Sequence, residues 1–260
     1  MKIGVFDSGL GGLTVVQSLM RTIKGADLFY IADTKHAPYG EKSPEEILRY
    51  SLDITEYFLN VHRIDALVVA CNTATSAAIA TLRERYPELI IVGTEPGIKP
   101  AVEQTRTGRV GVLATPATLQ GEKYQQLVDT YARHRDVILY EQACPGLVEQ
   151  IESGNIEHPD TRAMLEVWLH PMKRDRVDTI VLGCTHYPLV SELISDIMSH
   201  RLTLIHTGDA IAKRLLSLAS ERGYQNIGKN SLHLYATATI EQTIVENVLG
   251  RSASINTVIV

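Results

Sequence analysis

Short apolar runs alternate along the whole chain with longer segments in which apolar and polar positions are mixed. The runs Lys2–Phe6, Leu28–Ile31 and Ile90–Val92 carry β-branched or aromatic residues and are too short for helices, which predicts buried strands. The longer segments between them, of which Leu13–Ile23 is the first, predict helices. This alternation predicts an α/β protein with mainly parallel sheets.

One helix start is marked by residues with capping roles. Ser43 suits the N-cap of a helix that begins at Pro44, and Glu46 stands at the capping-box position. We predict that this helix runs to about His62.

Two stretches of the chain are nearly copies of one another. Ile64–Thr73 reads IDALVVACNT, and Val177–His186 reads VDTIVLGCTH. Each is an apolar run between an Asp and a Cys, which predicts a buried parallel strand with the Cys at its carboxyl end. Ligands bind at that end of α/β sheets. Two thiols presented by two copies of one strand–loop unit indicate chemistry performed from two opposed sides.

A second internal similarity supports two copies of one α/β unit. Arg109–Pro116 resembles Lys2–Gly9 in sequence, and the same order of elements follows each of these segments. After a strand at Leu202–Ile205, a turn begins a helix to about Gly223. A final strand at Leu232–Ala236 and a helix at Ile240–Leu249 then close the chain. These last elements have no counterpart in the second copy. We therefore predict a first domain of residues 1–97 plus 207–260 and a second domain of residues 98–206.

Composition narrows the class of protein. The 260 residues are 45% hydrophobic and 21% charged, with a formal net charge of −5. No basic run marks a nucleic-acid surface, and no apolar run approaches the roughly 18 residues that span a bilayer. The N-terminus enters a strand directly, without a signal-peptide pattern. Three cysteines are too few for a disulfide framework, so we expect reduced thiols in a cytoplasmic protein.

Cys71 and Cys184 are predicted to be functional, although buried Cys is often only a packing residue. Both precede polar residues and predicted helix starts, and a helix N-terminus lowers the thiol pKa from about 8.5. Pro188 suits the first turn after Cys184. A metal site that uses Cys184 and His186 is the competing interpretation. Because the chain lacks a Cys-x-x-Cys or paired-His motif, we expect no metal. Cys144 lacks a comparable helix setting and is interpreted as structural.

Two polar turns are candidate binding elements. Asp7–Gly12 resembles a phosphate-binding loop but lacks the G-x-G-x-x-G spacing and the Walker lysine; its amides would suit a carboxylate. Asp7 is a candidate acid/base or orienting group, with helix capping as the alternative. Thr115 and Thr118 fall where the second copy places the counterpart of Asp7 and Ser8. Their hydroxyls suit a carboxylate, although local capping is the usual role of such residues.

Two further features have ordinary interpretations by themselves. Pro38-Tyr39-Gly40 is a turn sequence, and Glu152 lies on a predicted helix, where an isolated carboxylate usually faces solvent.

Taken together, these stretches resemble the glutamate racemases of the aspartate/glutamate racemase superfamily over nearly the whole chain. The matching motifs are Asp7–Gly12, Pro38–Gly40, Cys71–Ala74, Glu95–Gly97 and Gly183–Pro188. His186 is typical of the glutamate branch, whereas aspartate racemases typically carry Glu at that position. The resemblance implies two similar domains related by pseudo-twofold symmetry, with the active site in a closed, water-poor cleft between them.

The resemblance also implies a mechanism that needs no cofactor. Cys71 would deprotonate D-glutamate while Cys184 protonates the opposite face, and the roles would exchange for L-glutamate. Asp7 would assist Cys71, while His186 and Glu152 would assist Cys184. The implied substrate-binding residues are Asp7, Ser8, Pro38, Tyr39, Gly40, Cys71, Asn72, Thr73, Thr115, Thr118, Cys184, Thr185 and His186. The product, D-glutamate, would supply peptidoglycan synthesis, and the enzyme would be a homodimer.

The residues leave other functions open. A related racemase would act on aspartate or a hydantoin. A Cys/His hydrolase would depend on Cys184 but not on Cys71. A small-ligand binding module or interaction subunit would be stabilised by its ligand without exchanging the ligand's α-proton. The paired cysteines count against this last function, because binding alone needs no thiol on each face.

Overall fold

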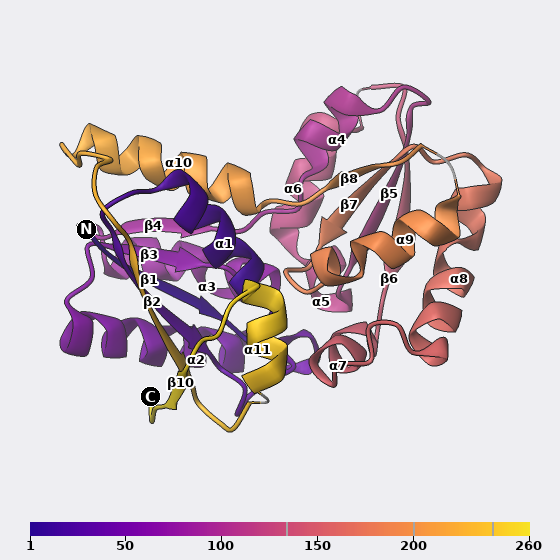
Figure 1. Cartoon of the computed structure of the whole chain (residues 1–260). Coiled ribbons are helices and arrows are strands. Elements are labelled where there is room, and N and C mark those ends of the chain that lie inside the picture. The colour runs from indigo at the N-terminus through magenta and orange to yellow at the C-terminus, as the bar shows by residue number, and fades with distance from the viewer. Residues whose placement is uncertain (134, 200, 241) are drawn as a thin grey trace. The chain divides into compact units, whose positions relative to one another are not determined.

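The chain forms two compact units in a computed structural model that describes residues 1–133, 135–199, 201–240 and 242–260. The first unit contains Met1–Thr94 and Gly208–Val260, and the second contains Glu95–Thr207. Each unit has its own parallel sheet with packed helices (Figure 1). The predicted α/β class with parallel sheets is therefore confirmed.

The first unit has a six-stranded sheet in the order β10-β9-β2-β1-β3-β4. Its strands are β1 (Lys2–Asp7), β2 (Asp27–Ala32), β3 (Ala66–Val69), β4 (Ile90–Gly93), β9 (Ser231–Ala236) and β10 (Ile255–Thr257). Its helices are α1 (Leu13–Thr22), η1 (Tyr39–Glu41), α2 (Pro44–Tyr57), η2 (Phe58–His62), α3 (Asn72–Arg85), α10 (Gly208–Glu221) and α11 (Gln242–Leu249). The C-terminal strand β9 pairs with β2, so the end of the chain joins the sheet built by its beginning.

The second unit has a four-stranded sheet in the order β6-β5-β7-β8. Its strands are β5 (Arg109–Ala114), β6 (Ile138–Ala143), β7 (Thr179–Gly183) and β8 (Thr203–Ile205). Its helices are α4 (Ile98–Gln104), α5 (Pro116–Gln120), α6 (Glu122–Tyr131), α7 (Leu147–Glu152), α8 (Pro159–Arg174), η3 (Tyr187–Val190) and α9 (Ser191–Met198).

The two sheets repeat one topology and one register. The order β2-β1-β3-β4 in the first unit corresponds to β6-β5-β7-β8 in the second. Ile3 pairs with Ala66 where β1 meets β3, and the equivalent pair between β5 and β7 is Val110 with Thr179. Each cysteine strand is thus a central neighbour of the first strand of its own sheet.

The apolar runs recognised in the sequence form the buried central strands of the two sheets. All four residues of β3 and all five of β7 are buried, as expected for parallel strands that are covered on both faces. In the first unit, side chains of α2 and α3 pack into one cluster with Phe6, Leu67 and Val69. The helix α1 packs against α10 and α11. These layers fix the carboxyl ends of β1 and β3, where Asp7 and Cys71 lie.

Two local predictions are corrected by the structure. The helix predicted to reach His62 is α-helical only to Tyr57, and Phe58–His62 forms a π-helical turn that ends where Arg63 adopts a left-handed φ of 53°. A strand after the last helix, β10, was missing from the prediction because three residues are too few to show a periodicity. The capping box of Ser43 and Glu46 is present as predicted. Glu241, within the helix predicted at Ile240–Leu249, lies outside the described residues.

Among the helices that the described residues form, none has both the length and the apolar character needed to cross a bilayer.

Candidate functional site

Cys71 lies at the N-terminus of α3, as predicted. It is the N-cap residue, and the backbone N–H of Ala74 donates to its Sγ atom at 3.4 Å. The thiol also contacts the Ser8 hydroxyl, with 3.7 Å between Sγ and Oγ. Because the first turn of a helix carries partial positive charge, this position favours a thiolate.

Asp7 and Ser8 lie beside this thiol, and Ser8 contacts both Cys71 and Asp7. Both are buried at the carboxyl end of β1, and the Ser8 hydroxyl donates to Asp7 Oδ1 at 3.2 Å. Gly12 is the N-cap residue of α1, and the Thr14 hydroxyl donates to the Gly11 carbonyl in the turn before this helix at 2.8 Å. A Cβ atom at Gly12 would lie 2.6 Å from the Asp7 Cβ atom, so glycine permits the close approach here. The glycine-rich turn therefore accommodates Asp7, which is connected through Ser8 to Cys71.

Asn72 and Thr73 are buried in the first turn of α3. Among the described residues, no hydrogen-bond donor reaches the Asn72 Oδ1 atom, although that atom is buried. A buried carbonyl oxygen without a donor costs free energy, on the order of 1–3 kcal/mol. The Asn72 Oδ1 atom is therefore suited to accept a hydrogen bond from a bound molecule.

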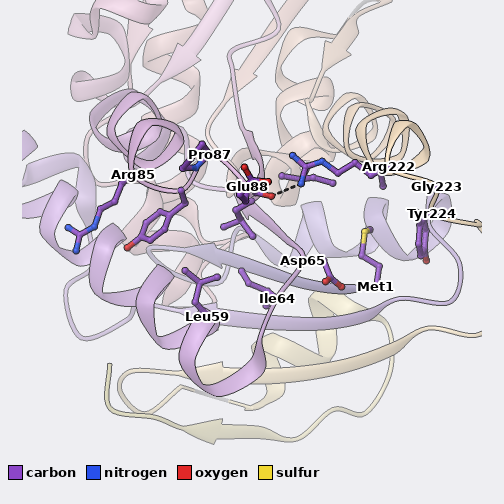
Figure 2. Close-up of a pocket in the computed structure, with 14 residues that line it drawn as sticks. Met1, Leu59, Ile64, Asp65, Arg85, Pro87, Glu88, Arg222, Gly223 and Tyr224 are labelled. Carbon is purple, nitrogen blue, oxygen red and sulfur yellow. Dashed lines mark hydrogen bonds between the residues drawn. The ribbon is translucent and has the colours of Figure 1, made fainter.

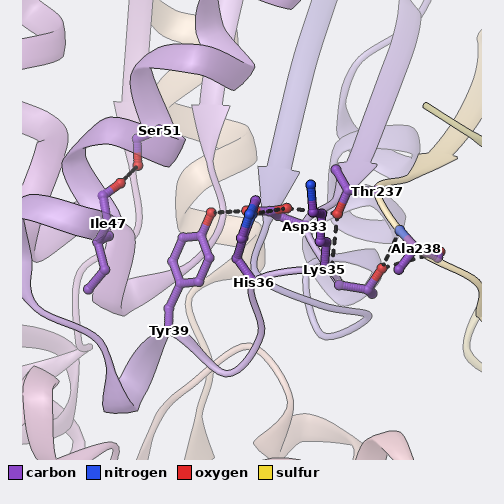
Figure 3. Close-up of polar contacts among 9 residues, drawn as sticks. Asp33, Lys35, His36, Tyr39, Ile47, Ser51, Thr237 and Ala238 are labelled. Carbon is purple, nitrogen blue, oxygen red and sulfur yellow. Dashed lines mark hydrogen bonds and ion pairs between the residues drawn. The ribbon is translucent and has the colours of Figure 1, made fainter. Parts of the chain in front are cut away.

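Tyr39 is buried within the turn that the sequence identified, but its hydroxyl is already engaged. It donates to Asp33 Oδ2 at 2.5 Å (Figure 3). Burial raises the pKa of Tyr39 well above its ordinary value of about 10, and the nearby Asp33 carboxylate raises that pKa further. The phenol therefore stays protonated at neutral pH.

Cys184 lies at the carboxyl end of β7 and has a different environment. Its Sγ atom is 3.6 Å from His186 Nδ1, and His186 Nε2 is 2.7 Å from Glu152 Oε1. The imidazole is buried, whereas the Glu152 side chain is 23% exposed. Cys184, His186 and Glu152 thus form a continuous chain of polar contacts, although Glu152 alone had the sequence signature of a solvated residue.

Hydrogen bonding sets the protonation of His186. Burial by itself would lower the imidazole pKa, but the contacts with Cys184 and Glu152 outweigh it and raise that pKa well above the ordinary value. A protonated imidazole beside Cys184 stabilises a thiolate there.

The predicted helix start after Cys184 is wrong. The residues that follow form the 3₁₀ turn η3, with Pro188 in its first turn, and α9 begins only at Ser191. Tyr187 N–H donates to the Cys184 carbonyl and Leu189 N–H to the His186 carbonyl, which are three-residue spacings. Because proline lacks an N–H group, no bond of α-helical spacing can start at Pro188. The imidazole therefore takes the place of a helix N-terminus beside this thiol.

Thr115 and Thr118 lie together at the carboxyl end of β5. Thr115 caps α5, with the Thr118 N–H donating to its hydroxyl oxygen at 3.2 Å, and the two hydroxyl oxygens are 2.9 Å apart. Thr185 is buried, with its Oγ1 atom 3.5 Å from His186 Nδ1. The capping role expected of Thr115 is thus present, and both hydroxyls stay at the strand end where the sequence placed them.

Cys144 contrasts with the other two cysteines. It is buried before α7, and burial raises the pKa of its thiol to about 12. A thiol that stays protonated at neutral pH is suited to packing.

A separate cavity lies at the amino ends of the strands of the first sheet, the end opposite to Cys71. It measures about 720 Å³ and is lined by residues at the amino ends of the strands, among them Met1, Asp65 and Ile90, and by Arg222 (Figure 2). Arg222 donates to the Glu88 carbonyl at 2.5 Å. None of the predicted site residues lines this cavity, and ligands of parallel sheets bind at the carboxyl ends of the strands.

Sequence reasoning missed Asp33. This buried carboxylate directly follows β2, and its backbone N–H donates to the Asp7 carbonyl at 2.9 Å. Asp33 follows β2 much as Asp7 ends β1, but this position alone gives no sign of its hydrogen-bond partners. No group of three or more His, Cys, Asp or Glu side chains arranged to hold a metal ion occurs among the described residues.

Two parallel α/β units, each with a cysteine at the carboxyl end of an equivalent strand, define the class to which this chain belongs. It is a member of the Asp/Glu/hydantoin racemase family, whose family model matches residues 3–215. Glutamate racemase from Sulfurovum sp. (strain NBC37-1) is 70% identical over 249 residues, which cover 96% of this chain and 94% of that protein.

Solved structures agree with this relationship. The crystal structure of glutamate racemase isoform RacE1 from Bacillus anthracis matches with a TM-score of 0.88 at 30% identity, covering 98% of this chain and 96% of that one. The glutamate racemase from Francisella tularensis in complex with D-glutamate matches with a TM-score of 0.84 at 26% identity, covering 100% of this chain and 97% of that one.

Proposed function

We propose that this protein is a glutamate racemase, an isomerase that interconverts L- and D-glutamate. The observation that carries the proposal is the pair of equivalent strand ends, each with a cysteine and its own polar partners. Cys71 contacts Ser8 and, through it, Asp7; Cys184 contacts His186 and, through it, Glu152. The similarity to proteins named glutamate racemase supports glutamate as the substrate. The product D-glutamate is a building block for peptidoglycan.

In the proposed reaction a cysteine thiolate removes the α-proton, so the C–H bond breaks and an S–H bond forms. The electron pair left on the α-carbon is delocalised into the substrate carboxylate. The thiol of the other cysteine then donates its proton to the opposite face and becomes the thiolate. One proton is taken and one is given, so the reaction balances without a cofactor.

The direction of racemisation determines which cysteine removes the α-proton. Cys71 removes the proton from D-glutamate and Cys184 removes it from L-glutamate. The N–H groups at the helix N-terminus support a thiolate at Cys71, and the protonated His186 supports one at Cys184. A cysteine acts as a general base only as the thiolate, the form that these neighbours favour.

Substrate binding is proposed for residues at the carboxyl ends of the strands and the turns that follow them. The set is Asp7, Ser8, Pro38, Tyr39, Gly40, Cys71, Asn72, Thr73, Thr115, Thr118, Cys184, Thr185 and His186. Asn72 Oδ1 is suited to accept a hydrogen bond from the substrate ammonium, because that buried atom has no donor among the described residues. The family resemblance further supports a cytoplasmic homodimer. In each subunit, residues 1–97 plus 207–260 would form one domain and residues 98–206 the other.

Incubation with L-glutamate in D₂O without added cofactor tests the function. Circular dichroism follows inversion and mass spectrometry follows deuterium at the α-carbon. We expect inversion with deuterium uptake by the wild-type protein, and loss of inversion in both Cys71→Ala and Cys184→Ala. Cys144→Ala is the matched control, because it removes the third buried thiol, and it should stay active.

The outcomes separate the alternatives. Loss of activity only in Cys184→Ala would indicate a hydrolase, and inversion of aspartate or a hydantoin but not glutamate would change the substrate. Stabilisation by glutamate without α-proton exchange would indicate a binding module. Slow exchange of D-glutamate by Cys184→Ala and of L-glutamate by Cys71→Ala would assign each thiol to its enantiomer.

A further inference from the structure

Asp33 is a buried carboxylate that the proposed mechanism does not use. It follows β2 directly, and its side chain is almost fully removed from solvent. Its backbone N–H donates to the Asp7 carbonyl at 2.9 Å, which extends the pairing of β2 with β1 by one residue. Asp33 is therefore anchored to the strand end that carries Asp7.

Three side chains surround the Asp33 carboxylate. The Tyr39 hydroxyl donates to Oδ2 at 2.5 Å, the Thr237 hydroxyl donates to Oδ1 at 2.7 Å, and His36 Nδ1 lies 3.0 Å from both oxygens (Figure 3). A buried carboxylate is costly unless hydrogen bonds replace its hydration. The same contacts that satisfy the carboxylate therefore hold these three side chains in place.

The segment from Asp33 to His36 is also attached to the end of β9. Lys35 N–H donates to the Thr237 hydroxyl oxygen, and Ala238 N–H donates to Thr34 Oγ1, each at 3.0 Å. These bonds hold the start of the segment. They leave the Tyr39 hydroxyl as the side-chain contact between Asp33 and the turn Tyr39–Glu41.

Tyr39 connects this network to the catalytic thiol. Its ring belongs to the same buried cluster as Cys71 and Ala74. A phenol has one O–H group, and in Tyr39 that group is directed to Asp33. While this bond is intact, the hydroxyl cannot also donate to a substrate carboxylate. Tyr39 can approach the substrate only through its ring, its oxygen lone pairs or its backbone.

We propose that Asp33 is a positioning residue for the racemase reaction. Its carboxylate fixes the Tyr39 ring, and with it the turn that carries Gly40, against the Cys71 side of the substrate. Asp33 itself touches neither the substrate nor the reacting proton. This inference rests on the proposed function and adds to it a carboxylate that acts only through Tyr39.

Kinetics of four variants test the proposal: Asp33→Asn, Tyr39→Phe, the double variant and Ser51→Ala. The control Ser51→Ala removes another buried hydroxyl, which donates to the Ile47 carbonyl within α2 and has no contact with Asp33 (Figure 3). We expect each single variant at the Asp33–Tyr39 pair to raise KM for both enantiomers about 10-fold, with a smaller change in kcat, because ground-state positioning is lost. The control should stay within about twofold of the wild-type protein.

The double variant identifies the route of the effect. If Asp33 acts through Tyr39, adding Asp33→Asn to Tyr39→Phe should change KM little further, so the two effects are not additive. Multiplication of the two KM effects, or a wild-type KM in Asp33→Asn despite lower thermal stability, would overturn the proposal. If Asp33→Asn does not fold, Tyr39→Phe decides alone: it keeps the other contacts of Asp33, and an unchanged KM would reject the role. Racemisation by the wild-type protein and Ser51→Ala tests the proposed function separately.

Discussion

Replacing Glu152 with Gln tests whether the carboxylate behind His186 contributes to catalysis. The two side chains meet with 2.7 Å between Nε2 and Oε1, and the imidazole is buried. Glutamine has the same shape and retains a hydrogen-bonding oxygen, so Glu152→Gln removes the charge with little change in packing. The perturbation therefore isolates the electrostatic effect of the carboxylate on the imidazole.

The magnitude follows from the contact. A hydrogen bond to a charged group contributes about 1.5–3 kcal/mol. Glu152→Gln removes the charge from this bond, so protonated His186 becomes less stable by up to about that amount. If Cys184 depends on that cation to form its thiolate, kcat/KM should fall by about 10-fold to 150-fold.

The assay is racemisation in both directions by circular dichroism, measured as a function of pH. Contacts with Glu152 and Cys184 raise the His186 pKa against the effect of burial, so in Glu152→Gln the loss of activity on the alkaline side should begin at lower pH. Glu149→Gln is the matched control, because Glu149 is exposed on the same helix α7. Near-wild-type kinetics with an unchanged pH profile in Glu152→Gln would refute the reasoning.

Two stability predictions complete the set. Ser43→Ala should lower the free energy of unfolding by about 1 kcal/mol in a urea titration, because it removes the N-cap bond of α2. The control Ser217→Ala, on the exposed face of α10, should change that free energy little. Equal free energies of unfolding for the two variants would contradict this prediction. His186 has a folded pKa above its unfolded value of about 6.5, so its stabilising effect is complete below about pH 6.5 and is lost as pH rises toward the folded pKa. The wild-type protein should therefore lose more unfolding free energy than His186→Gln between about pH 6 and about pH 9, and parallel curves would contradict this.

Local signals in the sequence were sufficient for most of the fold. The helix start at Ser43 could be predicted because its capping bonds join residues three positions apart. The two cysteine strands could be recognised because each is an apolar run in a fully buried position. The helix start after Cys184 could not be predicted correctly, since Pro188 is compatible with the first turn of both an α-helix and a 3₁₀-helix.

The polar partners of the site were harder to predict because the contacts are not local. Glu152 and His186 lie in different elements, α7 and the loop after β7, and no periodicity relates them. The family resemblance suggested a role for Glu152, and the structure supplied its contact with the imidazole. Asp33 had neither signal, since its partners Tyr39 and Thr237 come from opposite ends of the chain. Such residues are found only when the topology of the sheet is known.

The two units share a strand order and register, but their catalytic cysteines have different hydrogen-bonding partners. Cys71 receives a backbone N–H group and Ser8, whereas Cys184 receives a titratable imidazole backed by a carboxylate. L- and D-glutamate have equal free energies in water, so kcat/KM must be the same in both directions whatever these environments are. The asymmetry can therefore change which thiol is ionised and the separate values of kcat and KM, but it cannot make kcat/KM differ between the two directions. If Glu152 supports the thiolate at Cys184, its charge favours the form that accepts L-glutamate, and kcat in each direction depends on that balance.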